Sequence, residues 1–228
     1  MVSMCGRFVG YSTFDQIRSH FKVETVFPET IHPSYNIAPQ QKVAVVTQEG
    51  SERVLSFMHW GLVPSWAKDA SIGNKMINAR SETVAEKPAF KNAFRNRRCL
   101  IINDGFFEWQ GTKGNKKPMF IKPKGEYGPF GFAGLWEIWN SKDDKSEEYR
   151  SCTIITTEAS ESIKPIHHRM PVVLKPSVYV KWLDPAFRDS VGLKDILAGH
   201  RYRDFESHPV SRDVNFVKNN DESLIVGI

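Results

Sequence analysis

Three side chains able to take part in covalent or proton-transfer chemistry stand out: Cys5 in MVSMCGRF, Glu108 in DGFFEW and His167 in IHHRMP. Cys5 follows Met4, so in this sequence it offers a thiol without a free α-amine. A cysteine at the start of a chain would carry both groups on neighbouring carbons, and that pair condenses with aldehydes. The chemistry open to Cys5 therefore depends on whether the residues before it are absent.

Glu108 interrupts a strand-like apolar run and is surrounded by Phe106, Phe107 and Trp109. Apolar surroundings raise the pKa of a carboxyl group toward values useful for proton transfer. The alternative is that Glu108 is an outward-facing strand residue, because side chains alternate between the two faces of a strand. Both interpretations stay open from the residues alone.

His167 lies just before the strand-like run MPVVLK. Histidine is the usual proton carrier near neutral pH, although a plain loop histidine would fit the same position. A zinc site is not favoured, because the adjacent His167 and His168 would point apart and no Cys or Asp cluster accompanies them. We therefore expect no metal, and the lack of GxGxxG or Walker patterns predicts no nucleotide cofactor.

Several residues could contact nucleic acid. Asn36 in SYNIAP and Asn78 in MINARSET carry amides that both donate and accept, although turn chemistry explains either residue singly. The guanidinium of Arg80 matches phosphate geometry, and a surface salt bridge is the alternative. Trp60 and Trp66 bracket GLVPS; exposed aromatic rings stack on unpaired bases, whereas we expect Trp60 to belong to the core.

Length and composition indicate a soluble globular protein. A chain of 228 residues with 40% hydrophobic and 25% charged residues fits a single domain over 1–228. No apolar run approaches the ~20 residues of a membrane span, and the start lacks a secretory pattern. Three widely spaced cysteines form no disulfide framework, so we expect a reducing cytoplasm.

The formal net charge is +5, and the positive charge is unevenly placed. Residues 87–103 contain five basic side chains and no acid, and residues 109–125 contain five lysines and no acid. Two such windows suggest a surface that faces a polyanion. Solvated loops and strand edges protected by lysine explain them equally well.

The pattern of short apolar runs predicts a largely antiparallel α+β domain without βαβ rhythm. Ser12 and Asp15 resemble a capping box ahead of a helix whose apolar face includes Phe14, Ile17 and Phe21. Val43–Thr47, a Glu49–Gly50 turn and the run RVLSFMHW predict a hairpin. Further expected strands are CLIINDGFFEW, KPMFIKP, FGFAGLWEIW, CTIITT and MPVVLK, and further expected helices are 81–94, 177–182 and 195–198.

Seven motifs occur in a fixed order: CGRF, YNIAP, WGLVPSW, NARSET, DGFFEW, IHHRMP and HPVSRDVNFVKN. Together they closely resemble the SRAP family, SOS-response-associated peptidase-like proteins that attach covalently to abasic sites in single-stranded DNA. The resemblance runs from Cys5 to about Gly227. It implies mostly antiparallel strands in a pseudo-barrel with a few flanking helices, compatible with the strand-rich pattern.

The resemblance also implies roles for individual residues. Cys5 corresponds to the reactive N-terminal cysteine, and Asn36, Glu108 and His167 correspond to the family's catalytic Asn, Glu and His. The DNA-contacting positions match Pro39, Trp66, Asn78, Arg80, Thr156 and Arg169. The implied partner is single-stranded DNA that contains abasic sites, including sites at single-strand/double-strand junctions. We expect a monomer, in the cytoplasm and associated with the nucleoid in a bacterium.

The implied chemistry is physically sound. An abasic deoxyribose is mostly a closed hemiacetal with a little open aldehyde. A terminal α-amine has a pKa of about 7.7–8.0, so part of it is neutral at pH 7 and can form an imine. A thiol with a pKa of about 8.5 then closes a thiazolidine. Glu108 can move protons, His167 can hydrogen-bond the released sugar oxygen, and Asn36 can orient the thiol or amine.

This chemistry needs Cys5 to be the first residue. We expect Met4 to be the true start, with Met1 to Ser3 not native. Alternatively, the Cys5 thiol attacks the Met4 carbonyl, which would make the protein a cysteine-dependent autoprotease that also uses His167 and Glu108. A non-covalent single-strand binder with an inert Cys5 is the third possibility.

Overall fold

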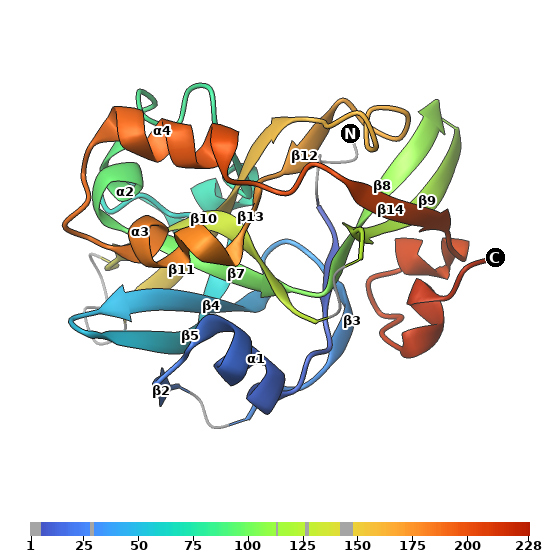
Figure 1. Cartoon of the computed structure of the whole chain (residues 1–228), viewed down its shortest axis with the longest axis horizontal. Coiled ribbons are helices and arrows are strands. Elements are labelled where there is room, and N and C mark those ends of the chain that lie inside the picture. Colours follow the sequence, from blue (N-terminus) through green and yellow to red (C-terminus); the bar gives the residue numbers. More distant parts are fainter. Residues whose placement is uncertain (1–5, 28–29, 113, 126–127, 142–147) are drawn as a thin grey trace.

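The computed structural model describes residues 6–27, 30–112, 114–125, 128–141 and 148–228, and its strands form two sheets (Figure 1). The smaller sheet has five strands, and all of its pairings are antiparallel. In spatial order its strands are β14 (Phe205–Pro209), β9 (Asn115–Pro123), β8 (Gly105–Thr112), β1 (Phe8–Gly10) and β3 (Ser34–Ile37).

The larger sheet has nine strands and is mixed, because β11 pairs in parallel with β5 and β6, and β2 with β5. Contact between β11 and β5 is limited to Ser151–His59 and Cys152–Trp60, so the sheet curls without becoming a closed barrel. The strands are β12 (Arg169–Pro171), β11 (Tyr149–Glu158), β10 (Phe130–Trp139), β7 (Arg98–Asn103), β4 (Lys42–Glu49), β5 (Glu52–Trp60) and β2 (Thr25–Val26), with β13 (Val173–Leu174) on β10 and β6 (Asn78–Arg80) on β11.

The α+β fold class is confirmed, with a few helices beside the sheets. The α-helices are α1 (Phe14–Phe21), α2 (Lys91–Asn96), α3 (Tyr179–Leu183) and α4 (Ser190–Gly199). The 3-10 helices are η1 (Ala70–Lys75), η2 (Pro176–Val178), η3 (Arg212–Asn215) and η4 (Glu222–Ile225).

Two helix predictions were wrong in detail. The capping box of α1 uses Thr13 and Gln16 rather than Ser12 and Asp15. Ser12 instead donates its hydroxyl and its backbone N–H to the buried Asp104 carboxylate. The helix expected over 81–94 is present only as α2, since the segment before it is a series of turns.

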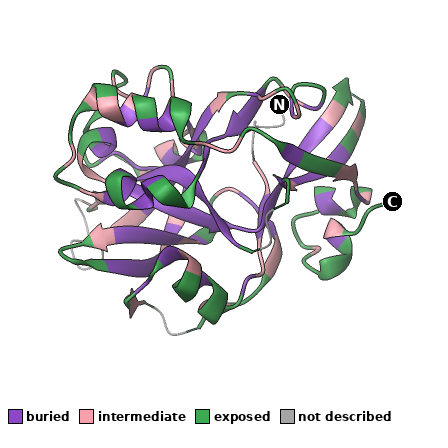
Figure 2. Ribbon diagram, viewed as in Figure 1, coloured by how far each residue is buried: buried purple, intermediate pink, exposed green. Residues whose placement is uncertain are grey.

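The larger sheet buries side chains on both faces (Figure 2). Leu100 and Ile102 of β7 pack into a core that contains helix residues such as Trp182. Cys99 and Ile101 of the same strand point into a second core. Side chains along β7 alternate between the two cores, as expected for a strand. The helices therefore cover one face of the larger sheet, and the smaller sheet approaches the other face.

The second core joins the two sheets, because it contains Phe8 of β1 and Phe106 of β8. A third core lies on the other face of the smaller sheet, where Phe107 and Trp109 pack with Val214 of the C-terminal segment. The two faces of β8 therefore have different surroundings. Phe106, Glu108 and Gln110 lie on the inter-sheet face, and Phe107 and Trp109 lie on the face toward the C-terminal segment.

Candidate functional site

The chain segment next to Cys5 runs beside Glu108. β1 pairs antiparallel with β8 through Phe8–Phe106, and Phe107 N donates to Arg7 O at 2.9 Å. Continued by two residues beyond Phe8, this register sets Gly6 opposite Glu108. Cys5 itself lies outside the described residues. The strand pairing thus reaches the residue that follows Cys5, and the predicted link between Cys5 and Glu108 stays a prediction.

Glu108 is buried, with 3% of its surface exposed, so the alternative of an outward-facing strand residue is wrong. Its face of β8 is directed at the loop between β11 and β12. Phe106 shares a core with Ile163 and Ile166 of that loop, and Gln110 Nε2 donates to Pro165 O at 3.0 Å. The loop ends with His167 and His168, and the same face of β8 therefore presents Glu108 toward the segment that carries His167.

His167 is half-buried, and its ring is oriented by the backbone. Arg169 N lies 3.1 Å from His167 Nδ1 and donates to it. When Nδ1 accepts this hydrogen bond, the neutral ring carries its proton on Nε2. Arg169 O is also 3.1 Å from Nδ1 and can accept from it when the ring is protonated. The Arg169 backbone therefore contacts Nδ1 with both a donor and an acceptor, and Nε2 takes part in neither contact.

The larger sheet brings four of the predicted DNA-contacting residues together. β6 pairs in parallel with β11, which sets Asn78 beside Ile154 and Arg80 beside Thr156. Arg169 Nη2 donates to Thr156 O at 2.9 Å and to Thr156 Oγ1 at 3.2 Å. Asn78, Arg80, Thr156 and Arg169 are therefore neighbours on three adjacent strands, next to His167.

Arg169 and Glu82 form a two-point ion pair, with Nη1–Oε1 at 2.6 Å and Nη2–Oε2 at 3.0 Å. Burial works to raise the pKa of Glu82, but hydrogen bonds and the charges of Arg169 and Arg80 outweigh it, so this pKa is lowered. The Arg169 side chain is 8% exposed, and its contacts are internal. It orders the turn around His167, and its predicted phosphate contact stays a prediction.

Arg80 differs from Arg169 because it is exposed. Within the part of the chain that the structure describes, no acid lies within salt-bridge distance of it. Its charge nevertheless contributes to lowering the pKa of neighbouring His168, after desolvation and the charges of His167 and Arg169. Arg80 is thus a cation at the site whose guanidinium faces solvent.

Trp66 lies in the segment that leads from β5 to β6, and Pro39 precedes Gln40, whose N–H donates to Trp60 O at 2.9 Å. Trp66 is 60% exposed, whereas Trp60 is fully buried, as expected, and donates Nε1–H to Ile77 O at 2.9 Å. A Cβ on Gly61 would lie 2.6 Å from Gly73 O, so the close backbone crossing in WGLVPSW requires glycine. Trp66 follows this crossing by five residues and presents an exposed ring, and its predicted DNA contact stays a prediction.

Asn36 is placed differently from the other predicted catalytic residues. Its Oδ1 accepts from Arg7 Nη1 at 2.6 Å, and its Nδ2 lies 2.7–3.3 Å from the carbonyl oxygens of Val214, Phe216 and Asn219. Arg7 Nη1 also donates to Val214 O at 2.7 Å and its guanidinium lies over Trp109. These contacts are on the face of the smaller sheet opposite Glu108.

Three residues of this arrangement were missed by sequence reasoning: Arg7, Glu82 and Gln110. Arg7 lies in the motif CGRF and Glu82 lies in the motif NARSET. Their position within these motifs is the sequence signal that could have identified them as site residues. Gln110 carried no signal, because its partner Pro165 is 55 residues away. Among the described residues, no cluster of three His, Cys, Asp or Glu side chains could hold a metal ion, and no helix is long and apolar enough to cross a membrane.

Comparison with known proteins agrees with the motifs. The chain matches the family described as SOS response associated peptidase (SRAP) over residues 4–217. It is 43% identical to the abasic site processing protein YoqW of Bacillus subtilis over 224 residues, which covers 97% of this chain and 99% of that protein. It is 34% identical to the abasic site processing protein HMCES of Xenopus tropicalis, covering 86% of this chain and 66% of that protein.

Solved structures share the fold. A protein from Bacteroides thetaiotaomicron superposes with a TM-score of 0.85 at 24% identity, covering 98% of this chain and 100% of that chain. A phage-related protein from Bordetella bronchiseptica has a TM-score of 0.70 at 26% identity and covers 91% of this chain and 95% of that chain. With the motifs, the site geometry and these matches in agreement, the chain belongs to the SOS response associated peptidase (SRAP) family.

Proposed function

We propose that this protein recognises abasic sites in single-stranded DNA and links to them covalently through Cys5 as an N-terminal residue. The relatives at 43% and 34% identity are named abasic site processing proteins, which supports the lesion as substrate. The observation that carries the proposal is the register of β1 on β8. It brings the residue that follows Cys5 opposite the buried Glu108, on the face directed at the His167 loop.

The reaction balances without an external reagent. The neutral α-amine of Cys5 adds to the sugar aldehyde, and the carbinolamine loses one water to give an imine. The thiol then adds to the imine carbon, its proton passes to the nitrogen, and a thiazolidine closes. An aldehyde and an aminothiol thus give one ring and one water, with no change of oxidation state.

Glu108 supplies the proton transfers in this proposal. Its carboxyl group is removed from solvent on a rigid strand, beside the chain segment that carries the nucleophile. It takes a proton as the sugar ring opens and returns one as the carbinolamine loses water. His167 hydrogen-bonds the ring oxygen that becomes a hydroxyl through Nε2, because Nδ1 is held by the backbone of Arg169.

Binding of the strand is proposed to be independent of sequence. Arg80 meets a backbone phosphate, and the exposed ring of Trp66 stacks on a base next to the lesion. An abasic nucleotide has no base to unstack, so its sugar reaches the site at little cost. We further propose that the chain forms a single domain, since both sheets contribute to the site.

A denaturing gel tests the proposal. Protein beginning at Cys5 is incubated with a single strand that contains one abasic site and with the same strand intact. We expect a band of slow mobility with the abasic strand only, and none with Cys5→Ser. Linkage by Cys5→Ser, or equal linkage to the intact strand, would refute it. In a parallel incubation of protein that begins at Met1, cleavage between Met4 and Cys5 without linkage would favour the autoprotease.

A further inference from the structure

Cationic side chains bind the phosphates that flank a lesion, and two of the arginines near the site are already engaged. Arg7 is bonded to Asn36 and to Val214 O. Arg169 is paired with Glu82 and is 8% exposed at its side chain. Arg80, on β6, remains as an exposed cation on the side of the larger sheet. The other side of the site is formed by β8 and β9.

The β8–β9 hairpin carries most of the lysines in the acid-free window 109–125. Lys122 and Lys124 lie 3.1 Å and 3.9 Å from Glu206 and Asp204, respectively. Lys113 lies outside the described residues. Lys117 is exposed, and no acid of the described chain is within salt-bridge distance of it. Lys117 therefore forms no ion pair within the described part of the fold.

The register determines the face on which Lys117 lies. Glu108 pairs with Met119 and Gln110 pairs with Lys117, so these four side chains share one face of the hairpin. Met119 packs against the core between the sheets, and Gln110 reaches Pro165 O, which identifies this face as the one toward the site. Lys116 pairs with Gly111 and lies on the opposite face.

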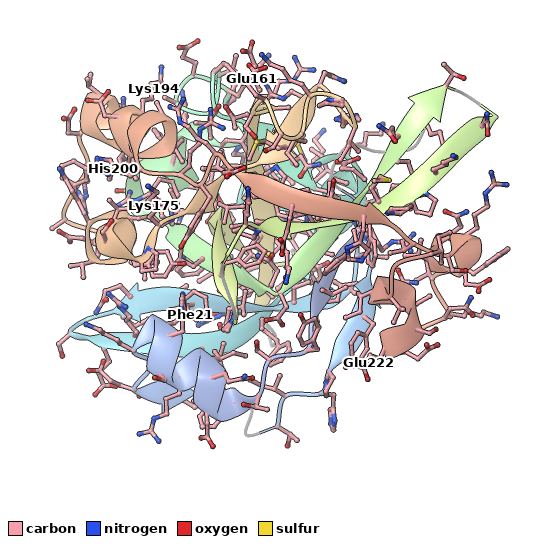
Figure 3. The ribbon with its side chains drawn as sticks, turned by 45° about the vertical axis from the view of Figure 1, so that its right-hand side comes forward. Phe21, Glu161, Lys175, Lys194, His200 and Glu222 are labelled. Atoms are coloured by element: carbon pink, nitrogen blue, oxygen red, sulfur yellow. The ribbon has the colours of Figure 1, made fainter. Side chains whose placement is uncertain are left out.

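The hairpin lies at the end of the molecule away from the α-helices, and the loop that carries the labelled Glu161 lies between it and α4 (Figures 1 and 3). Gln110 lies two residues beyond Glu108 on β8, about 7 Å along the strand, and Lys117 lies opposite Gln110 on β9. A lysine on a flexible stem at that place reaches a backbone phosphate next to a sugar held at Glu108.

We propose that Lys117 binds a backbone phosphate on one side of the abasic nucleotide, while Arg80 binds a phosphate on the other side. The inference rests on the proposed function, because the lesion is taken to lie between Glu108 and His167. It adds the β8–β9 hairpin as a DNA-binding element, with Lys117 as the cation that the described residues present on its site face. The contact is a point charge on a phosphate and carries no base preference.

The first test measures affinity for an intact single strand at several salt concentrations, with Lys117→Ala and the matched control Lys116→Ala. Affinity falls as the salt concentration rises, and loss of one phosphate contact makes the slope of log affinity against log salt less steep by about 0.7. If the variant and the wild type bind equally well at 1 M salt, this change in slope makes the variant bind about fivefold more weakly than the wild type at 0.1 M salt. We expect this change for Lys117→Ala, none for Lys116→Ala and recovery with Lys117→Arg. Equal effects of the two alanine variants would overturn the proposal.

The second test uses two abasic oligonucleotides, one with nucleotides only before the lesion and one with nucleotides only after it. We expect Lys117→Ala to weaken binding of one of them and Arg80→Ala to weaken binding of the other. If both variants weaken the same oligonucleotide, the assignment to opposite sides is wrong.

The two proposals fail in different ways. An intact strand has no aldehyde, so the salt slope reports on Lys117 whether or not linkage occurs. Normal linkage to the abasic strand with unchanged slopes for Lys117→Ala would refute this inference alone. A lowered slope for Lys117→Ala without any linkage by protein that begins at Cys5 would refute the proposed function alone.

Discussion

Arg7 Nη1 and Asn36 Oδ1 are 2.6 Å apart and join the strand that follows Cys5 to the C-terminal segment. Asn36 reaches the carbonyls of Val214, Phe216 and Asn219, and Arg7 reaches Val214 O as well. At the other end of β1, the Asp104 carboxylate accepts from Tyr11 N and Ser12 N. β1 is therefore anchored on both sides, which fixes the residue next to Cys5.

The anchoring by Asn36 predicts a loss of stability on substitution. Asn36→Ala leaves the Arg7 guanidinium and three carbonyls without this partner, and we expect a decrease of about 2–4 kcal/mol in the free energy of unfolding. Denaturant unfolding measures it. A catalytic Asn36 that only orients the thiol or amine would instead give a slower linkage rate at unchanged stability, and that result would contradict the anchoring role.

Glu108→Gln tests the proposed proton transfer. The variant keeps the shape of the side chain, and we expect single-turnover linkage to an abasic strand to slow by about a hundredfold or more. Affinity for an intact strand should stay the same or rise, because a negative charge is removed. Glu137→Gln is the control, since Glu137 is a buried carboxyl on β10 that pairs with Arg97 at 2.7 Å. Loss of affinity with a normal linkage rate would reverse the assignment.

The Glu82–Arg169 pair predicts a pH dependence. The folded-state pKa of Glu82 is lowered, so its stabilising contribution is present above the unfolded-state pKa and is lost as the pH falls through the folded-state pKa. Glu82→Gln should lower the free energy of unfolding by about 1 kcal/mol near neutral pH, because the half-exposed carboxylate is screened by solvent.

The stability difference between wild type and Glu82→Gln should vanish in acid, where Glu82 is protonated. Unfolding measured from acid to neutral pH checks this. Glu148→Gln provides an exposed comparison, because Glu148 pairs with Arg150 at 3.2 Å on the surface, and we expect a smaller difference there. A Glu82→Gln difference that stays constant across the pH range would show that the ion pair does not contribute.

The strands could be predicted from alternation, but not the sheet to which each belongs. CLIINDGFFEW was expected as one strand, whereas the structure divides it into β7 and β8, which lie in different sheets. The division occurs at Asp104, whose carboxylate binds the backbone of Tyr11 and Ser12 about 90 residues earlier in the chain. Such a long-range partner leaves no local pattern.

The candidate site was only partly predictable for the same reason. Glu108 and His167 carry proton-transfer groups within recognisable motifs, so residue type and motif identified them as candidates. The contacts of Asn36 depend on a segment 178 or more residues away, and those of Arg169 depend on Glu82. Residue type suggested a polar role for both, but only the fold supplies their internal partners.

The mass of the denatured protein–DNA adduct tests the central claim most directly. Protein encoded from Met4 and protein that keeps Val2 to Met4 ahead of Cys5 are each incubated with an abasic strand, without added reductant. The account predicts an adduct only for the first, with the mass of a chain beginning at Cys5 plus the strand minus one water. A stable adduct whose protein part still includes Met4 would contradict it, because Cys5 would then have no free amine.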